Sequence, residues 1–530
     1  MFKQRVGLIL FSPVFFLIFG GASISSRAAT PPLDLTGYDQ IRYVSASTGS
    51  NATGEGTIDS PWASVSSAIY RLEDASEDNL YAFLVASGTD ANDFPPILMK
   101  PWIHLYGGFD PTTWERGTAK HKTILLGKPG KPILRGADHI VLDGLIIRDA
   151  RPGLSDTNPP IKSGGGGIKF RSVSSVLVSN CTITHNEAGS AYQDAGGVSC
   201  IDSRVTFADC IFSENRTGKN GGGVYGQDSD LEFVRCVFKG NSSTNGAGVF
   251  LLSSVASLQE CDFVDNESIT GGGGLCSHRS SSEVTRCRFT HNEAFVGGAA
   301  GIFYDSSCFF SNCLVISNTA LGEGGGLALS GDSFHRLTNC TIARNKASVG
   351  SGGVQSYGSA YSLVNCILWG NEPNGINLVD ATPSVAYSVA QGGLPGIGNV
   401  DADPMFVDPE NGDFRLQQGS VCIDSGSPEF GRGLPPRFLV HGDFDGWVRI
   451  WDGDGDGQPR VDMGAFEFGS SAKVGDLTSD SGIDALDLFI AQSVWGPPTG
   501  VGTVYGDQNG DNRFNARDLL ILEYAWRKLD

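Results

Sequence analysis

Basic residues are scarce in this sequence of 530 residues. It contains 38 Lys and Arg against 58 Asp and Glu, which gives a formal net charge of −20 at pH 7. Nucleic acid and anionic membrane surfaces would repel such a chain, so the charge argues against both as partners. The same acidity suits calcium, a cationic or neutral glycan, or simple solubility.

Long apolar runs are absent after the N-terminus. Lys3 and Arg5 precede an apolar run from Val6 to Phe19, and small residues follow, with a cleavage site expected near Ala22 or Ala28. This order is typical of a secretory signal peptide, and the run is too short for an ordinary membrane span. We therefore predict a signal peptide over 1–29 and a bacterial protein that is secreted or held at the cell surface. The mature chain is expected to have no membrane span.

Cysteine pairs at metal-binding spacing are also missing, although the chain has 12 cysteines. No CxxC or Cys/His pair at ligand spacing occurs, which argues against a zinc-type site. Eight of the cysteines belong instead to a recurring phrase in which an asparagine follows five residues later. These are Cys181, Cys210, Cys236, Cys261, Cys287, Cys313, Cys340 and Cys366, with asparagines from Asn186 to Asn371.

Successive cysteines of the phrase are 29, 26, 25, 26, 26, 27 and 26 residues apart. A fixed period of this length indicates a repeat architecture. Apolar residues also recur three before and two after each cysteine, as Val178 and Ile183 do around Cys181. These two positions have opposite parity, so one unbroken strand could not point both inward. We predict two short strands with a bend near the cysteine, and the cysteine and the second residue after it facing inward.

Glycine clusters such as Gly221-Gly-Gly-Val224 separate the phrases. Glycine costs roughly 1 kcal/mol per residue in a helix interior, which excludes a helical repeat. A coil of short strands and tight turns is instead a rung of a right-handed parallel β-helix, whose equivalent residues stack at roughly 4.8 Å. The asparagine is expected to adopt the left-handed backbone of a sharp turn and to bond its neighbours through its amide. The stacked cysteines are expected to be buried free thiols, because parallel side chains fit a disulfide poorly.

The phrase resembles the right-handed β-helix superfamily of pectate lyases and bacterial surface proteins, over roughly Ile140 to Ser388. The resemblance implies a mainly β fold with a solenoid over 136–400. Residues 30–135 contain the pattern of strand, turn, helix and strand, and we expect them to form an N-terminal cap and the first coils. Residues 401–468, with Val461-Asp462-Met-Gly-Ala-Phe-Glu467, resemble the choice-of-anchor Q type of C-terminal module. We predict a second cap there and a linker over 469–474.

Residues 475–530 contain two 12-residue segments that begin 31 residues apart and are rich in oxygen ligands. Positions 1, 3, 5, 9 and 12 are Asp476, Thr478, Asp480, Asp484 and Asp487 in the first, and Asp507, Asn509, Asp511, Asn515 and Asp518 in the second. Calcium takes roughly six to eight hard oxygens, which a loop of this length can supply. Aspartate at position 12, and a helix expected only after each loop, resemble a type I dockerin. The resemblance implies calcium as cofactor and a cohesin-like protein as partner, with a small α-helical domain at the C-terminus.

Some residues in and around these loops depart from the dockerin pattern. The partner-recognition positions are Ala485, Leu486, Ala516 and Arg517, which are not the family's commonest residues there and leave the partner open. Ser481 and Asn512 stand where each loop expects a glycine. Asparagine tolerates a left-handed turn better than serine does, so the first loop is the weaker candidate. A separate run, Asp452-Gly-Asp454-Gly-Asp456-Gly, is a weaker calcium candidate still, because its twelfth residue is Met463.

No catalytic constellation is evident in the sequence. The resemblance implies that β-helix enzymes cut acidic polysaccharides on one outer face, with clustered aspartates, calcium and a basic residue. Neither a polygalacturonase-like aspartate triad nor a lyase-like aspartate group with a following arginine occurs. His185 and His291 share one position of the phrase, but varied polar residues fill it elsewhere, which indicates a solvated face. A groove beside the loop 151–163 is the remaining hypothesis, lined by Lys162, Lys169, Arg171 and Asp194.

Three functions stay open. We favour a secreted, non-catalytic β-helix that presents a carbohydrate- or surface-binding face and docks through its calcium module. A second possibility is a polysaccharide lyase or O-glycosyl hydrolase in polysaccharide catabolism, because dockerins commonly accompany glycan-degrading enzymes. The third is a structural adhesin or envelope protein in which the calcium loops only add rigidity.

Overall fold

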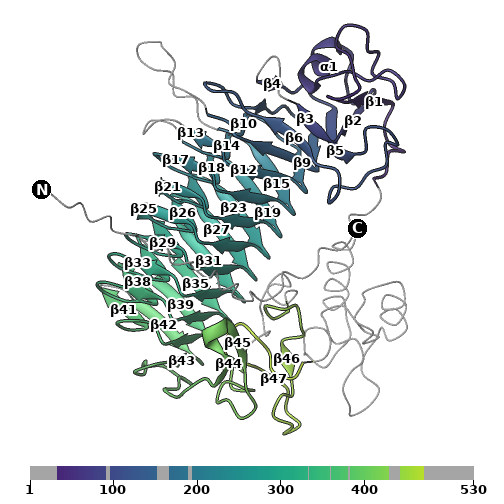
Figure 1. Ribbon diagram of the computed structural model, residues 1–530. Helices are drawn as coiled ribbons and strands as arrows, with labels where there is room; N and C mark the ends of the chain where they lie inside the picture. Colours follow the sequence, from purple (N-terminus) through teal and green to yellow (C-terminus); the bar gives the residue numbers. More distant parts are fainter. Residues whose placement is uncertain are drawn as a thin grey trace, which may run out of the picture.

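The computed structural model describes residues 33–90, 96–151, 166–188, 194–331, 334–358, 360–379, 382–428 and 442–470. They form one elongated solenoid of parallel sheets with a small C-terminal module at one end (Figure 1). The predicted signal peptide, residues 471–474 of the predicted linker and the predicted domain over 475–530 lie outside the described residues.

Four parallel sheets make up the solenoid, and we number them in the order in which the chain visits them. Sheet I contains β1 (Gln40–Val44), β2 (Tyr81–Ala86), β5 (Ile103–Phe109), β8 (Ile140–Asp143), β11 (Val176–Ser179), β15 (Arg204–Ala208), β19 (Asp230–Val234), β23 (Val255–Gln259), β27 (Ser281–Thr285), β31 (Ser307–Ser311), β35 (Phe334–Thr338), β39 (Ala360–Val364) and β42 (Thr382–Ala386). Sheet II contains β3 (Gly88–Asp90), β6 (Thr123–Leu126), β9 (Leu145–Arg148), β12 (Thr182–Thr184), β16 (Ile211–Ser213), β20 (Val237–Lys239), β24 (Asp262–Val264), β28 (Arg288–Thr290), β32 (Leu314–Ile316), β36 (Thr341–Ala343), β40 (Ile367–Trp369) and β43 (Val389–Ala390).

The other two sheets lie on the return path of each coil. Sheet III is short and contains β13 (Glu187–Ala188), β17 (Arg216–Thr217), β21 (Ser242–Asn245), β25 (Glu267–Gly271), β29 (Glu293–Ala294), β33 (Thr319–Ala320) and β37 (Lys346–Ala347). Sheet IV contains β4 (Ile97–Leu98), β7 (Leu134–Arg135), β10 (Ile168–Arg171), β14 (Val198–Ile201), β18 (Val224–Gln227), β22 (Val249–Leu252), β26 (Leu275–His278), β30 (Ala300–Phe303), β34 (Leu327–Ser330), β38 (Val354–Tyr357) and β41 (Ile376–Val379).

The core consists of identical or similar side chains stacked in columns, as the period predicts. Phe233, Cys236 and Phe238 are all fully buried, which confirms the predicted inward positions. Rings in the same column stack almost flat, with 4.6 Å between the centroids of Phe238 and Phe263. The predicted bend lies at the residue before each cysteine, where Arg235 has a left-handed φ of 51°. Its guanidinium bonds Asp209 of the preceding coil at 2.8 Å, so the bends also form a column.

All twelve cysteines are free and buried, which confirms the expectation of free thiols. Each ladder thiol lies near backbone carbonyls; the Sγ of Cys236 is 3.4 Å from the carbonyl oxygen of Phe207 in the preceding coil. Burial raises the pKa of the Cys181 thiol to about 12. The ladder therefore acts as a column of small apolar side chains.

The asparagine ladder exists, but its backbone role differs from the prediction. Each amide nitrogen donates to the next asparagine, as Asn241 Nδ2 does to Asn266 Oδ1 at 2.9 Å. The left-handed residue is the one before the asparagine: His185, Glu214 and Asp265 have φ of 55°, 54° and 56°. The prediction that asparagine itself takes this conformation was wrong. Its side chain must turn inward to bond the ladder, so the preceding exposed residue makes the turn.

The predicted order of strand, helix and strand at the N-terminal end is confirmed. The helix α1 (Val65–Arg71) begins after Ser64, whose hydroxyl accepts a hydrogen bond from the Ser67 amide. β1 and β2 pair in parallel and extend sheet I beyond the first coils. The two strands therefore cover the edge that β5 would otherwise leave unpaired at this end of sheet I.

The C-terminal module packs against the outer side of sheet II over the last coils, at the end of the solenoid. It contains β44 (Phe406–Asp408), η1 (Pro409–Asn411), β45 (Asp413–Leu416), β46 (Ile450–Trp451) and β47 (Arg460–Val461). Phe414 and Met463 pack against Ile316, Ala343 and Ile367, which lie on the outer side of sheet II over its last coils. None of the described helices has the length and apolar character that crossing a membrane requires.

Candidate binding face and cation site

The ten predicted calcium ligands and the four predicted partner contacts all follow Ser470 and lie outside the described residues. His185 and His291, by contrast, are exposed on the turn after sheet II, as expected for a solvated face.

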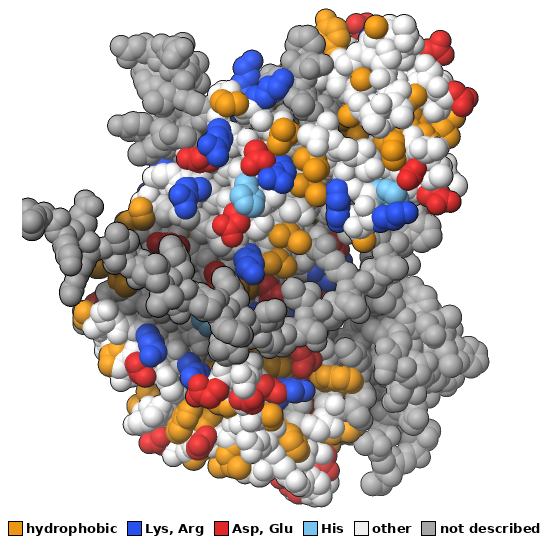
Figure 2. All heavy atoms as spheres, in the orientation of Figure 1, with side chains coloured by type: hydrophobic (Ala, Val, Ile, Leu, Met, Phe, Trp, Pro, Cys, Tyr) orange, Lys and Arg blue, Asp and Glu red, His pale blue; other side chains and the backbone are white. Residues whose placement is uncertain are grey.

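Three of the four residues of the hypothetical groove lie on or beside sheet IV; Lys162 is outside the described residues. Lys169 and Arg171 face outward from β10, and burial together with Arg171 and Arg135 lowers the pKa of Lys169. Asp194 is held by the next coil, where Lys219 Nζ lies 2.7 Å from its carboxylate. Figure 2 shows basic and acidic side chains interspersed with hydrophobic ones on the face in view. The groove therefore stays a prediction.

Some side chains on the outer side of sheet IV are buried by another segment of the chain. Tyr225, Phe250 and Cys276 point away from the core, yet each is at most 4% exposed. The segment that connects sheet III to sheet IV covers these side chains, because it turns back over the strand of sheet IV that follows it. Gly246 lies in this segment, and a Cβ built on it would lie 2.8 Å from the Phe250 Cβ. Gly246 has a φ of 59°, a conformation that glycine adopts without strain. Sheet IV thus carries a second, smaller apolar layer on its outside.

Aromatic rings fill this outer layer. Tyr225 and Phe250 are stacked with centroids 5.8 Å apart, and Phe250 meets the edge of His278 at 4.9 Å. His278 also contacts Tyr304 at 4.7 Å. The Sγ of Cys276 lies 3.6 Å from His278 Nε2. Burial lowers the pKa of His278 and raises that of Cys276, so the pair is a neutral imidazole and a thiol and not an activated nucleophile.

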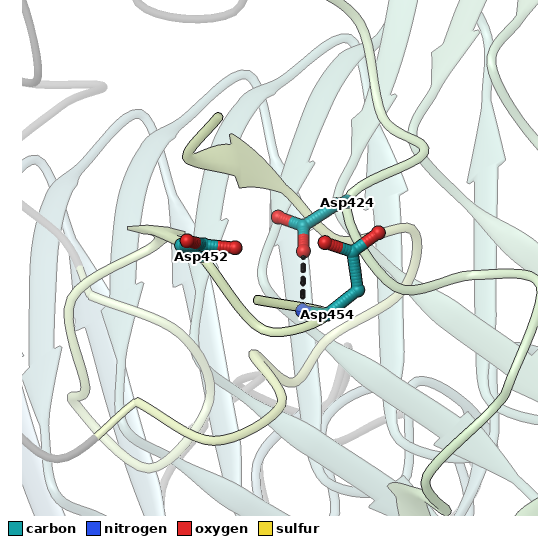
Figure 3. Close-up of side chains that lie close together, drawn as sticks. All are labelled: Asp424, Asp452 and Asp454. Carbon is teal, nitrogen blue, oxygen red and sulfur yellow. Dashed lines mark hydrogen bonds between the residues drawn. The ribbon is translucent and has the colours of Figure 1, made fainter. Parts of the chain in front are cut away.

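Three carboxylates converge in the C-terminal module (Figure 3). The side chains of Asp424, Asp452 and Asp454 each place an oxygen within 4.8 Å of the others. Asp424 Oδ2 accepts the backbone amides of Gly453 and Asp454, both at 2.9 Å, which holds the loop against it. Burial raises the pKa of Asp424. Hard oxygen donors of this kind suit calcium.

This arrangement differs from the calcium loop considered for the same run. Met463, the twelfth residue, is buried in the apolar contact with sheet II and offers no oxygen. The third carboxylate is Asp424, which lies 28 residues before Asp452 in the sequence. A local loop pattern cannot reveal a ligand supplied from such a distance.

A second acidic group is buried nearby. Asp443, Asp462 and Glu467 surround Arg449, and Glu467 Oε2 lies 3.7 Å from the Arg449 Nε. Burial raises the pKa of Asp443 to about 6 and that of Asp462 to about 7, and it also raises the pKa of Glu467. Arg449 Nη2 donates to the carbonyls of Asp462 and Gly464, which fixes the end of the module. Asp443, Arg449, Asp462 and Glu467 are all buried among the described residues.

Two overlapping segments of the chain, 133–263 and 242–388, match the model of the right handed beta helix region. The solenoid is a right-handed β-helix. Residues 474–525 match the model of the dockerin type I domain, a domain that binds calcium and typically binds cohesins. No curated protein sequence matches the chain.

Several solved structures resemble the β-helix at low identity. Pectate lyase Pel9A is 11% identical with a TM-score of 0.40, over 81% of this chain and 97% of that one. The complex of XylC with xylose is 8% identical, with a TM-score of 0.38, over 69% and 87%. The A-module of mannuronan C-5 epimerase AlgE6 from Azotobacter vinelandii is 10% identical, with a TM-score of 0.36, over 64% and 95%. At these values the similarities carry no inference about function.

One buried histidine makes the β-helix sensitive to acid. His335 lies on β35 and is 0% exposed, and neither ring nitrogen has a hydrogen-bond partner among the described residues. Its neighbour in the column is Tyr361, which is also buried. Desolvation lowers the pKa of His335 from 6.5 to about 4. The native state therefore keeps this imidazole neutral where the unfolded chain would protonate it.

The free energy of unfolding is expected to fall as the pH drops from 6.5 towards 4, because only the unfolded chain binds the proton. At pH 5 the loss from His335 is about 2 kcal/mol. In His335→Leu this loss should vanish. Urea unfolding of the wild type and of the variant at pH 7.5 and pH 5 measures this loss. The buried carboxyls change stability in the opposite direction, but they are the same in both proteins, so comparing the two proteins isolates the effect of His335. An equal loss in the variant would show that His335 is not responsible.

Proposed function

We propose that this is a secreted bacterial β-helix protein that presents a carbohydrate-binding face and docks through a calcium-dependent dockerin domain onto a cohesin. The observation that carries the proposal is the dockerin type I match over 474–525, directly after the β-helix and its C-terminal module. A docking module fixes the chain to a scaffold, and the solenoid then offers long outer faces to an extended ligand. The N-terminal pattern of a signal peptide supports export.

The calcium ions are assigned to the two predicted loops. The first would be held by residues from Asp476 to Asp487 and the second by residues from Asp507 to Asp518. Ala485, Leu486, Ala516 and Arg517 are the proposed contacts with the cohesin.

A polysaccharide panel separates this function from the enzymatic alternative. The full chain is incubated with soluble polysaccharides, and both retention of the protein and release of reducing or unsaturated sugars are measured. We expect retention without product release. Release of product would establish a polysaccharide-degrading enzyme, and absence of both would favour the structural adhesin or envelope protein.

A further inference from the structure

The connection between sheets III and IV carries a row of exposed apolar side chains. Ile269, Phe295, Leu321 and Val349 are 70, 53, 56 and 59% exposed. The register pairs Ala294 with Ala320, so the residues that follow them, Phe295 and Leu321, occupy equivalent places in successive coils. The amide of Leu321 donates to the Ala294 carbonyl at 2.9 Å, which keeps the row aligned. Ile269, Phe295 and Leu321 lie in one column, and Val349 lies one position beyond it in the next coil, so the four form a contiguous apolar surface feature.

A second set of apolar groups lies beside this row, at the outer edge of sheet IV. The ring of Phe303 leans over Gly271: a Cβ there would lie 3.0 Å from Phe303 Cε2. Gly271 ends β25, the strand that also contains Ile269. Tyr304 follows Phe303 and is 61% exposed. The row and these aromatic rings therefore belong to one face.

The charges beside the row itself are acidic or already paired, whereas Arg279, next to Tyr304, is an exposed basic side chain. Glu267 and Glu293 face each other in the register of β25 and β29, and both are exposed. Lys346 occupies a corresponding place on β37 and pairs with Glu372 at 3.3 Å. Glu323 accepts the Tyr357 hydroxyl at 2.6 Å. The acidic side chains along the row disfavour a polyuronate there and favour an uncharged ligand.

An extended neutral polysaccharide has the chemistry to fit this face. Each pyranose ring has an apolar face of C–H groups, which packs on aliphatic and aromatic side chains, and a rim of hydroxyls that carboxylates and threonines can bind. The coils repeat at about 4.8 Å, close to the spacing of rings in an extended β-linked chain. Successive rings can thus meet successive residues of the row.

We infer that the row Ile269, Phe295, Leu321 and Val349, with Phe303 and Tyr304, is a binding site for a neutral, extended polysaccharide that lies along the solenoid axis. The inference rests on the proposed carbohydrate-binding function and gives it a location and a substrate class. A protein partner would need no repeat along the axis, whereas a polysaccharide uses every coil of the row.

The test is affinity electrophoresis of the full chain in gels that contain hydroxyethylcellulose, arabinoxylan, galactomannan or polygalacturonate. The variant is Phe295→Ala combined with Leu321→Ser, and the matched control is Phe334→Ala, an exposed phenylalanine on sheet I. We expect at least one neutral polysaccharide, and not polygalacturonate, to retard the wild-type protein. The double variant should bind about tenfold more weakly and the control unchanged. Both substitutions are at exposed positions, and equal urea midpoints confirm intact folding.

The outcomes separate the site from the function. If polygalacturonate alone retards the protein, or the double variant is retarded as strongly as the wild type, the site is wrong while carbohydrate binding stands. If no polysaccharide retards the wild-type chain, the carbohydrate-binding function fails, and the site fails with it.

Discussion

Chelation of calcium is expected to abolish binding of the full chain to a type I cohesin. The two predicted loops begin and end with aspartates, Asp476 and Asp487 in the first and Asp507 and Asp518 in the second. Loops of this kind fold around their ion, so removing it also removes the helices that would contact the cohesin. We expect affinity to fall by at least about a hundredfold. Surface plasmon resonance over immobilised cohesins in calcium, then EDTA, then restored calcium measures it.

The two loops are expected to differ. Asp507→Ala should weaken cohesin binding more than Asp476→Ala does, because the first loop has Ser481 where a glycine is expected and should hold its ion less well. Asp59→Ala, at an exposed aspartate of the N-terminal region, is the control. Binding that survives EDTA would contradict the calcium-dependent docking. Equal losses of cohesin binding in the two variants would contradict only the ranking of the loops and not the calcium-dependent docking.

Asn266→Ala is expected to lower the free energy of unfolding by about 4 kcal/mol. The Asn266 amide donates to the Phe238 carbonyl at 2.8 Å and to Asn292 Oδ1 at 2.8 Å, while its Oδ1 accepts the backbone and side-chain amides of Asn241. All these groups are buried. Alanine would leave the buried Asn241 backbone N–H without a partner, which costs about 1–3 kcal/mol, and would also remove the side-chain bonds to the Phe238 carbonyl and to Asn292 Oδ1.

Urea unfolding measures this change, with Glu267→Ala as the control. Glu267 is the next residue along and is exposed, so its replacement should alter stability by less than about 0.5 kcal/mol. A loss at Asn266 no greater than that at Glu267 would show that the asparagine ladder contributes little to the stability of the β-helix.

The core was predictable because its chemistry is local and repeated. Cys236 recurs in every phrase, and the positions of Phe233 and Phe238 are apolar in every phrase; only a bend between them lets all three face inward. The stacking of equivalent residues then follows from the period. The amide ladder was predictable for the same reason.

Features that depend on other elements were not predictable. Both Asp265 and Asn266 suit a left-handed turn, and only the inward direction of the Asn266 amide shows that Asp265 makes it. Asp424 joins Asp452 only through the folding of the module. The exposed row from Ile269 to Val349 begins midway along the solenoid and so escapes a search for positions common to all coils.

The coupling of a carbohydrate-binding β-helix to a docking module can be measured in one assay. Beads coated with a type I cohesin are mixed with the full chain and a labelled neutral polysaccharide, and the label that sediments with the beads is counted. The account predicts that label sediments only when both the chain and calcium are present, and that EDTA releases it. Label that stays in solution despite captured protein, or that remains on the beads in EDTA, would contradict the account.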